Sequence, residues 1–199
     1  MCEAHGFEPL RVAEACLRGG ARLLQLRVKN GRGAGFLRLA EAFVSAASPF
    51  AARVIVNDRA DVAVLSGAAG VHVGQQDISV EAALSIVGPG GLVGLSTHDE
   101  AQIDAAMAGP ASYVAVGPVF TTATKDTGYS ARGLELVRYA AAGRKPIVAI
   151  GGITLARANE VIAAGAGAVA VIGDLFATGD PEGRTRAFLA SMPARPFNV

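Results

Sequence analysis

The chain has 199 residues, of which 51% are hydrophobic and 18% charged, as expected for one soluble packed domain and not for an extended disordered chain. Its net charge is +1, without a basic run or an aromatic-interleaved basic stripe, so a nucleic-acid partner is not expected. No apolar stretch has the length of a membrane span or the position of a signal peptide. We therefore expect a single domain over 1–199, a cytoplasmic location and small-molecule partners, with a homo-oligomer left open.

The first predicted element is a helix over Pro9–Arg18, which has Pro9 in its first turn and ends at Gly19-Gly20. A short strand follows at Leu23–Arg27. The same sequence of helix end, Gly/Ala turn and short apolar strand recurs along the chain and predicts a repeated unit of helix and strand. Six further strands are predicted: Val54–Val56, Val71–Val73, Leu92–Ser96, Tyr113–Gly117, Ile147–Ile150 and Ala168–Ile172.

The later strands are almost continuous apolar runs, which is typical of a parallel sheet covered by helices on its faces. Seven strands, each followed by a helix, favour an α/β fold of the (β/α)8 TIM-barrel type. The chain opens with a helix, so the first strand of the barrel is expected to be missing. An open doubly wound sheet is the rival architecture, but no GxGxxG follows an early strand to support it.

Two carboxylates follow successive predicted strands, Asp58 after Val54–Val56 and Asp77 after Val71–Val73. Parallel strands end at a common rim, so both side chains are expected there. Oxygen ligands without His or Cys favour Mg²⁺, which completes its shell with water and phosphate. The alternative is that Asp58 and Asp77 cap the helices that begin near Ala60 and Val80.

Basic and polar side chains alternate where the first predicted strand ends. Gln25, Arg27 and Lys29 have a spacing of two and so share one side of the pleat. An Arg and a Lys together suit a diphosphate, because the guanidinium binds two oxygens and the ammonium acts as a point charge. The alternative is a solvated strand terminus.

The segment after Leu92–Ser96 is predicted to be mostly structural. Thr97 and Asp99 are expected to cap the next helix, and His98 is expected to have a structural role. Ser96 is the residue expected to project from the strand end toward a ligand.

The long segment Gly117–Tyr129 separates a strand from the helix that begins near Gly133, and such loops are commonly functional. Thr122, Thr124 and Lys125 offer two hydroxyls and an ammonium for a carboxylate or phosphate, with Gly128 as a hinge. An ordinary polar loop is the alternative.

Glycines follow the last two predicted strands, at Gly151-Gly152 and Gly173. In α/β barrels these two loops commonly bind phosphate through backbone N–H groups. We expect a phosphate here, with Gly needed because a side chain would hold the phosphate away.

Together these motifs resemble the thiamine-phosphate synthase family. The matching segments, in the family's order, are QLRVK (25–29), VNDR (56–59), GVHVGQQD (70–77), GLSTH (94–98), VGPVFTTATKD (116–126) and AIGGIT (149–154). The resemblance implies a (β/α)8 barrel and a transferase that joins 4-amino-5-hydroxymethyl-2-methylpyrimidine diphosphate to thiazole phosphate. The products would be thiamine phosphate and pyrophosphate.

The resemblance also implies roles for individual residues. Asp58 and Asp77 would hold Mg²⁺ at the diphosphate, and Arg27, Lys29, Lys125 and Ser96 would be catalytic. The pyrimidine diphosphate would be bound by Gln25, Arg27, Lys29, Asn57, Ser96 and Lys125, and the thiazole phosphate by Thr122, Thr124, Gly152, Ile172 and Gly173.

The chain departs from the family at its first strand, which has no counterpart before Pro9, and at Gly173, where the family commonly has Ser. Two other functions are kept open: an isomerase like the related thiazole tautomerases, and a non-catalytic binder of thiamine precursors. The isomerase is disfavoured because the full diphosphate and metal set is present.

Overall fold

The protein is described by a computed structural model, which covers residues 6–28, 31, 33–122 and 128–193. The helices are α1 (Pro9–Arg18), α2 (Gly33–Ala47), α3 (Ala60–Ser66), α4 (Val80–Val87), α5 (Glu100–Ala108), α6 (Gly133–Ala141), α7 (Leu155–Ala163) and α8 (Pro181–Ser191), with short 3-10 turns η2 (Ser48–Phe50) and η3 (Gly173–Phe176). The strands are β1 (Leu23–Leu26), β2 (Arg53–Asn57), β3 (Gly70–Val73), β4 (Leu92–Thr97), β5 (Tyr113–Val116), β6 (Ile147–Ile150) and β7 (Ala168–Ala170).

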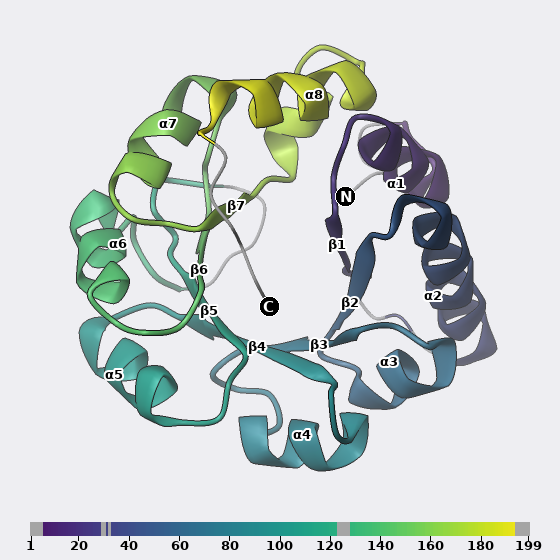
Figure 1. Ribbon diagram of the computed structural model, residues 1–199, viewed down its shortest axis with the longest axis horizontal. Helices are drawn as coiled ribbons and strands as arrows, with labels where there is room; N and C mark the ends of the chain where they lie inside the picture. The colour runs from purple at the N-terminus through teal and green to yellow at the C-terminus, as the bar shows by residue number, and fades with distance from the viewer. Residues whose placement is uncertain (1–5, 29–30, 32, 123–127, 194–199) are drawn as a thin grey trace.

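The strands form one parallel sheet in the order β1 to β7, each strand pairing with the next along the chain. The sheet is curled and the helices lie on its outer side (Figure 1). The prediction of an α/β fold of the TIM-barrel type with seven strands is confirmed. The strand boundaries differ slightly, because Arg27 and Ile172 lie beyond the ends of β1 and β7.

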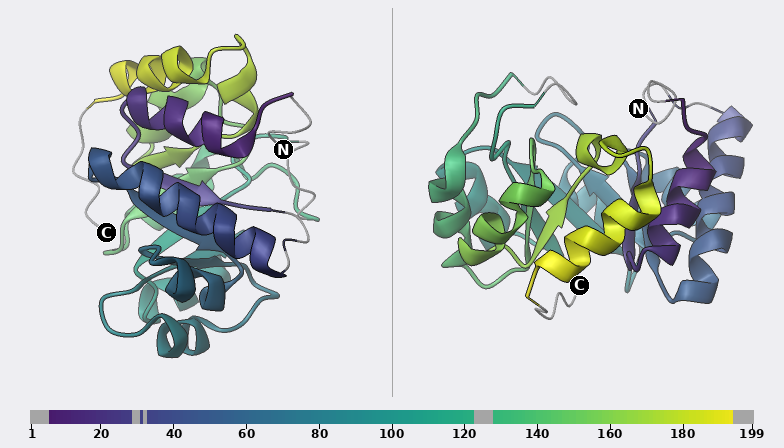
Figure 2. Two further views of the ribbon diagram at one scale, coloured as in Figure 1. Left: turned by 90° about the vertical axis from the view of Figure 1, so that its right-hand side faces the viewer. Right: turned by 90° about the horizontal axis from the view of Figure 1, so that it is seen from above.

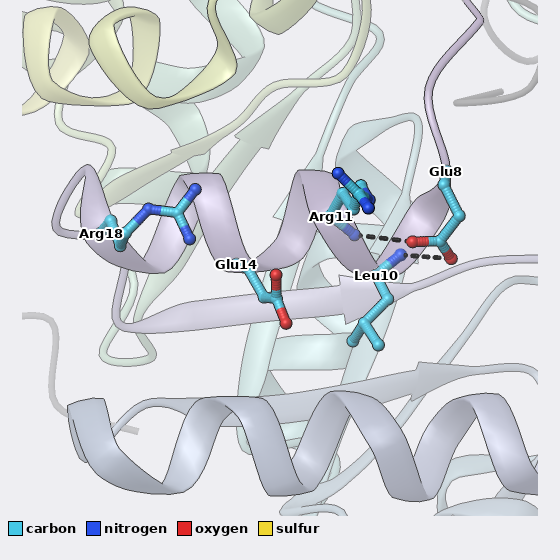
Figure 3. Close-up of a pocket in the computed structure, with 5 residues that line it drawn as sticks. All are labelled: Glu8, Leu10, Arg11, Glu14 and Arg18. Carbon is cyan, nitrogen blue, oxygen red and sulfur yellow. Dashed lines mark hydrogen bonds between the residues drawn. The ribbon is translucent and has the colours of Figure 1, made fainter.

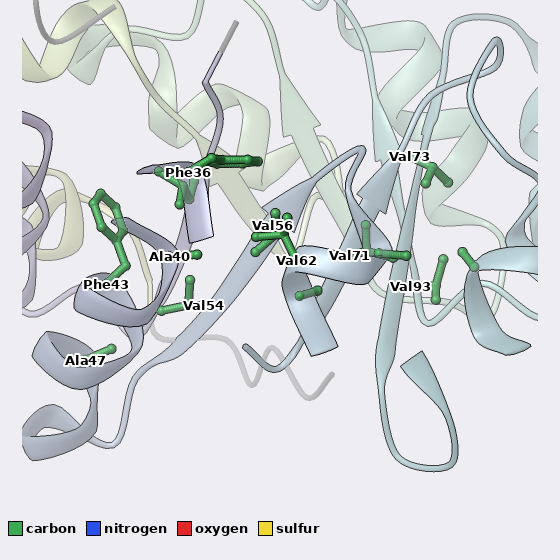
Figure 4. Close-up of a cluster of buried hydrophobic side chains, with 14 of the residues drawn as sticks. Phe36, Ala40, Phe43, Ala47, Val54, Val56, Val62, Val71, Val73 and Val93 are labelled. Carbon is green, nitrogen blue, oxygen red and sulfur yellow. The ribbon is translucent and has the colours of Figure 1, made fainter. Parts of the chain in front are cut away.

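Most of the core lies between the sheet and the helices. Alternation along the strands sends Val54 and Val56 of β2, and Val71 and Val73 of β3, toward α2 and α3 (Figure 4). A smaller apolar cluster lies on the inner face of the sheet, formed by Tyr113, Ala115 and Val148.

The first and last helices touch each other, although the first and last strands do not pair. Arg18 of α1 donates to Glu182 of α8 at 2.9 Å. A Cβ on Gly19 would lie 2.6 Å from the Glu182 carbonyl oxygen, so only glycine permits this close approach. Two views show α1 and α8 side by side (Figure 2). The ring of helices thus meets outside β1 and β7, which are the end strands of the described sheet.

None of the described helices has both the length and the apolar character that a membrane crossing requires.

Candidate active site

Asp58 is fixed at the rim where the strands end. It follows the last residue of β2, and its N–H donates to the His72 carbonyl oxygen of β3 at 2.8 Å. Its φ is +65°, a left-handed conformation that costs free energy for residues other than Gly, Asn and Asp. The N-cap residue of α3 is Arg59, and its side chain makes no capping hydrogen bond. The alternative that Asp58 caps α3 is therefore wrong.

Asp77 lies at the adjacent strand end, in the turn after β3. Its Oδ2 accepts a hydrogen bond from the Gly74 N–H at 2.7 Å, which orients the carboxylate within this turn. Helix α4 is capped by Ser79, whose hydroxyl accepts from the Ala82 N–H, so the alternative that Asp77 caps α4 is also wrong.

The pair of carboxylates fits a magnesium ion. β2 and β3 are adjacent, so Asp58 and Asp77 follow neighbouring strands at one rim, and both are exposed. Mg²⁺ typically takes one or two protein carboxylates and keeps water and phosphate as its other ligands. Within the described residues there is no group of three or more His, Cys, Asp or Glu side chains that would suit a metal enclosed by protein.

Arg27 brings an unpartnered cationic donor to this end of the sheet. Its Nε is buried, and it has no hydrogen-bond partner among the residues that the structure describes. Burying a charged donor without a partner is costly, so the position is suited to an anion that supplies one. Gln25, two residues earlier, hydrogen-bonds Tyr113 across the sheet. Lys29 lies outside the described residues.

Ser96 is buried and joins a polar cluster inside the sheet. Its Oγ lies 2.8 Å from His72 Nε2, and His72 Nδ1 lies 3.0 Å from the Tyr113 hydroxyl. His72 and Tyr113 are not among the site residues predicted from the sequence, because each lies within a strand whose other residues are mostly apolar. The sequence does contain a signal for them. Each polar ring lies next to apolar residues that face the helices, so the ring itself faces the other side of the sheet.

His98 has a structural role, as predicted. It is buried, its Nδ1 lies 2.5 Å from the Gly117 carbonyl oxygen, and its ring stacks on Tyr129 with centroids 4.2 Å apart. Asp99 caps α5 by accepting from the Gln102 N–H, which confirms that prediction. Thr97 does not cap the helix, since its hydroxyl donates to the Ala115 carbonyl oxygen.

The loop after β5 lies against the loop after β6. The Phe120 N–H donates to the Gly151 carbonyl oxygen at 3.0 Å. A Cβ on Gly152 would lie 2.5 Å from the Thr121 carbonyl oxygen, and Gly152 has a φ of +66°. The close contact and the positive φ both require glycine at this position, in addition to the predicted approach of a phosphate. Thr122 follows on this loop, whereas Thr124 and Lys125 lie outside the described residues.

The loop after β7 is tied to the start of α7. Ile172 and Gly173 are exposed and begin the 3-10 turn η3. In the same turn Asp174 Oδ2 accepts from the Leu155 N–H at 3.0 Å and from the Arg184 guanidinium at 2.6 Å. The two loops predicted to bind phosphate are therefore joined by one carboxylate.

A hollow of about 550 Å³ lies elsewhere, on the exposed side of α1 (Figure 3). Its lining includes Glu8, which caps α1 by accepting from the Leu10 and Arg11 N–H groups. Arg18, at the other end of the hollow, pairs with Glu182. These side chains are already used in structural contacts, so the rim of the sheet is the better candidate for the site.

The family sequence model described as "Thiamine monophosphate synthase" matches residues 2–175. The chain belongs to this family. A thiamine-phosphate synthase of Chlorobium luteolum is 40% identical over 185 residues, covering 92% of this chain and 87% of that protein. A thiamine-phosphate synthase of Mycobacterium marinum is 44% identical over 180 residues, covering 85% and 81%.

The solved structure of thiamine phosphate pyrophosphorylase from Pyrococcus furiosus is similar, with a TM-score of 0.86 and 29% identity over 92% of this chain and 89% of that one. As a member of the thiamine monophosphate synthase family, the protein is an enzyme of thiamine biosynthesis. It is a transferase that forms thiamine phosphate from a pyrimidine and a thiazole part.

Proposed function

We propose that the pyrimidine part enters as 4-amino-5-hydroxymethyl-2-methylpyrimidine diphosphate and that its diphosphate is held at the rim formed by the ends of β1, β2 and β3. The observation that carries this proposal is the buried, unpartnered Nε of Arg27 among the described residues. Asp58 and Asp77 follow the two adjacent strands and are the proposed ligands of Mg²⁺.

In the proposed reaction the C–O bond between the pyrimidine methylene and the diphosphate breaks first, and its electron pair leaves with pyrophosphate. The thiazole nitrogen then donates its lone pair to the methylene carbon, forming the C–N bond. The pyrimidine amino group stabilises the intervening cation, so catalysis depends on charge neutralisation and positioning rather than on a strong base.

The protein's own residues would neutralise the departing group. Arg27 donates from the end of β1, and Lys29 and Lys125 would add two further positive charges, with Asn57 and Ser96 as polar contacts. Mg²⁺, when bound, would neutralise diphosphate oxygens and make pyrophosphate a better leaving group.

The thiazole phosphate is proposed to bind where the loops after β5, β6 and β7 come together. Thr122 and Thr124 would contact the thiazole, and Gly152, Ile172 and Gly173 would offer backbone groups to its phosphate. The packing of Gly152 against Thr121 and the Asp174 contact to Leu155 support this placement, because they join the three loops. The cytoplasmic location and a homo-oligomer stay predictions from the sequence.

The proposal is tested by measuring thiamine phosphate formation from the two phosphorylated substrates, first with Mg²⁺ and then with EDTA. We expect product only with the metal. Arg27→Gln should lower kcat/KM for the pyrimidine diphosphate by roughly 100-fold or more, since a charged contact to the leaving group is lost. Arg138→Gln, on the outer surface of α6, is the matched control and should leave the rate unchanged.

Two results would contradict the proposal. One is metal-independent product formation. The other is interconversion of thiazole phosphate isomers by the folded protein without condensation, which would support the tautomerase alternative instead.

A further inference from the structure

Gln75 attaches the turn after β3 to the end of β4. Its Nε2 donates to the Ser96 carbonyl oxygen at 2.7 Å. A carbonyl oxygen only accepts hydrogen bonds, so the NH₂ group of the Gln75 amide must face β4. The direction of this contact is therefore fixed. The proposed function assigns no role to Gln75.

The Ser96 carbonyl group lies just beyond the paired part of β3 and β4. The register of the two strands ends at Val73 and Leu95, and Ser96 is the next residue of β4. Ser96 is 5% exposed, and a buried carbonyl oxygen is stabilised by a donor from the protein. The Gln75 side chain supplies that donor from a position two residues after the end of β3.

The same turn carries Asp77, a proposed ligand of Mg²⁺. Gly74 and Asp77 are bonded to each other twice. The Gly74 N–H donates to Asp77 Oδ2 at 2.7 Å, and the Asp77 N–H donates to the Gly74 carbonyl oxygen at 3.3 Å. In the part of the chain that the structure describes, Asp77 Oδ1 accepts no hydrogen bond. Oδ1 is therefore the oxygen that this carboxylate can offer to a cation.

The other proposed ligand, Asp58, is held in a different way. Its N–H donates to the His72 carbonyl oxygen at 2.8 Å, so its main chain is bonded directly to β3. Among the described residues, the main chain of Asp77 is bonded only within its own turn, and residues 75–79 are exposed. Hydrogen bonds in an exposed turn compete with water and constrain it weakly. Besides its covalent links to β3 and α4, the turn thus has the Gln75 contact to β4 to hold Asp77 in place.

We propose that Gln75 is a positioning residue of the metal site, which fixes the turn after β3 through the Ser96 carbonyl and thereby directs Asp77 Oδ1 toward the ion. This inference rests on the proposed function, in which Asp58 and Asp77 hold Mg²⁺. Side chains that orient a metal ligand without touching the metal commonly change metal affinity by about 10- to 100-fold when they are substituted.

The test uses Gln75→Met, which keeps the length of the side chain and removes its donor. The measured quantity is the Kd of Mn²⁺ alone, from the electron paramagnetic resonance signal of the free ion, because Mn²⁺ takes the same oxygen ligands as Mg²⁺. We expect the Kd to rise by roughly tenfold. The KM for thiazole phosphate, which is proposed to bind at other loops, should not change.

Gln76→Met is the matched control. Gln76 is the next residue of the same exposed turn, and it makes no hydrogen bond within the described residues. The same substitution there should leave the Mn²⁺ Kd unchanged. The Tm of each variant in EDTA measures stability without the metal. If Gln75→Met lowers this Tm but keeps the wild-type Kd, Gln75 only stabilises the turn and the inference is overturned.

A double-mutant cycle separates an effect through Asp77 from an effect through Ser96. In an Asp77→Asn background, Gln75→Met should leave the residual Mn²⁺ affinity unchanged within about twofold, since the carboxylate that it orients is absent. An equal rise in Kd in both backgrounds would overturn the inference. If Gln75→Met does not fold, Gln75→Ala removes the same donor and is judged by the same Kd. A wild-type protein that binds no Mn²⁺ would instead contradict the metal site of the proposed function.

Discussion

Asp58 combines a left-handed backbone, which Asp tolerates better than most non-glycine residues, with a side chain that makes no cap for the helix after it. Left-handed non-glycine residues are uncommon and often lie at functional sites. Asp58 and Asp77 were predictable from the sequence because each lies in the short turn after an apolar strand. The contacts of His72 and Tyr113 were not predictable, because they depend on which strand face turns inward and on a partner two strands away.

At the residue scale we predict that Asp58→Asn separates folding from catalysis. Asn tolerates the left-handed conformation and has the same shape, so the free energy of unfolding should change by less than about 0.5 kcal/mol. Loss of the charge should lower condensation by orders of magnitude. It should also abolish the rise in Tm that Mg²⁺ and the pyrimidine diphosphate together give the wild type.

Asp61→Asn is the control for this experiment. Asp61 is exposed and pairs with Arg59, whose hydrogen bond lowers the pKa of the Asp61 carboxyl. Normal activity is expected in this variant. An Asp58→Asn protein that keeps both its activity and its metal-dependent Tm would remove Asp58 from the metal site.

Asp174 connects two elements of the fold, the loops after β6 and β7. Its carboxylate accepts from the first N–H of α7 and from Arg184 of α8, and both side chains of the ion pair are largely buried. The strands themselves were predictable from their apolar runs, within one or two residues at each end. The contact between loops was not, because Leu155 and Asp174 are 19 residues apart and no local pattern links them.

We predict that Asp174→Asn weakens binding of the thiazole phosphate. The variant leaves Arg184 without its charged partner and loosens both loops, so the free energy of unfolding should fall by about 1–3 kcal/mol. The KM for thiazole phosphate should rise roughly tenfold, while the KM for the pyrimidine diphosphate stays constant. Glu135→Gln, which removes the exposed partner of Arg138, is the control. Equal changes in both KM values would mean that Asp174 supports the fold and not this part of the site.

At the scale of the whole molecule, the alternation of helix and strand was enough to predict a barrel-type fold with seven strands. Each unit is local in sequence, and the apolar strands pack against helices on the outer side of the sheet (Figure 1). The contact between α1 and α8 could not be predicted from the sequence, because Arg18 and Glu182 are 164 residues apart.

Glu182→Gln tests this contact through its pH dependence. Hydrogen bonds from Arg18 and then Arg186 lower the pKa of the Glu182 carboxyl in the folded protein. A lowered folded pKa gives stability that is present above the unfolded value and lost as the pH falls through the folded value. The wild type should therefore have a higher Tm than the variant at about pH 7, and the difference should shrink as the pH falls below the ordinary Glu pKa of about 4.3. A difference that grows on acidification would contradict this assignment.

The strand order of the sheet follows the order of the strands in the sequence, and this order affects how the protein folds. Every strand pairs with its successor, so most of the structure can assemble by short loop closures, whereas the α1–α8 contact must bring distant parts of the chain together. Contacts of that kind commonly form after the transition state. In stopped-flow experiments Glu182→Gln should therefore accelerate unfolding and leave the refolding rate unchanged.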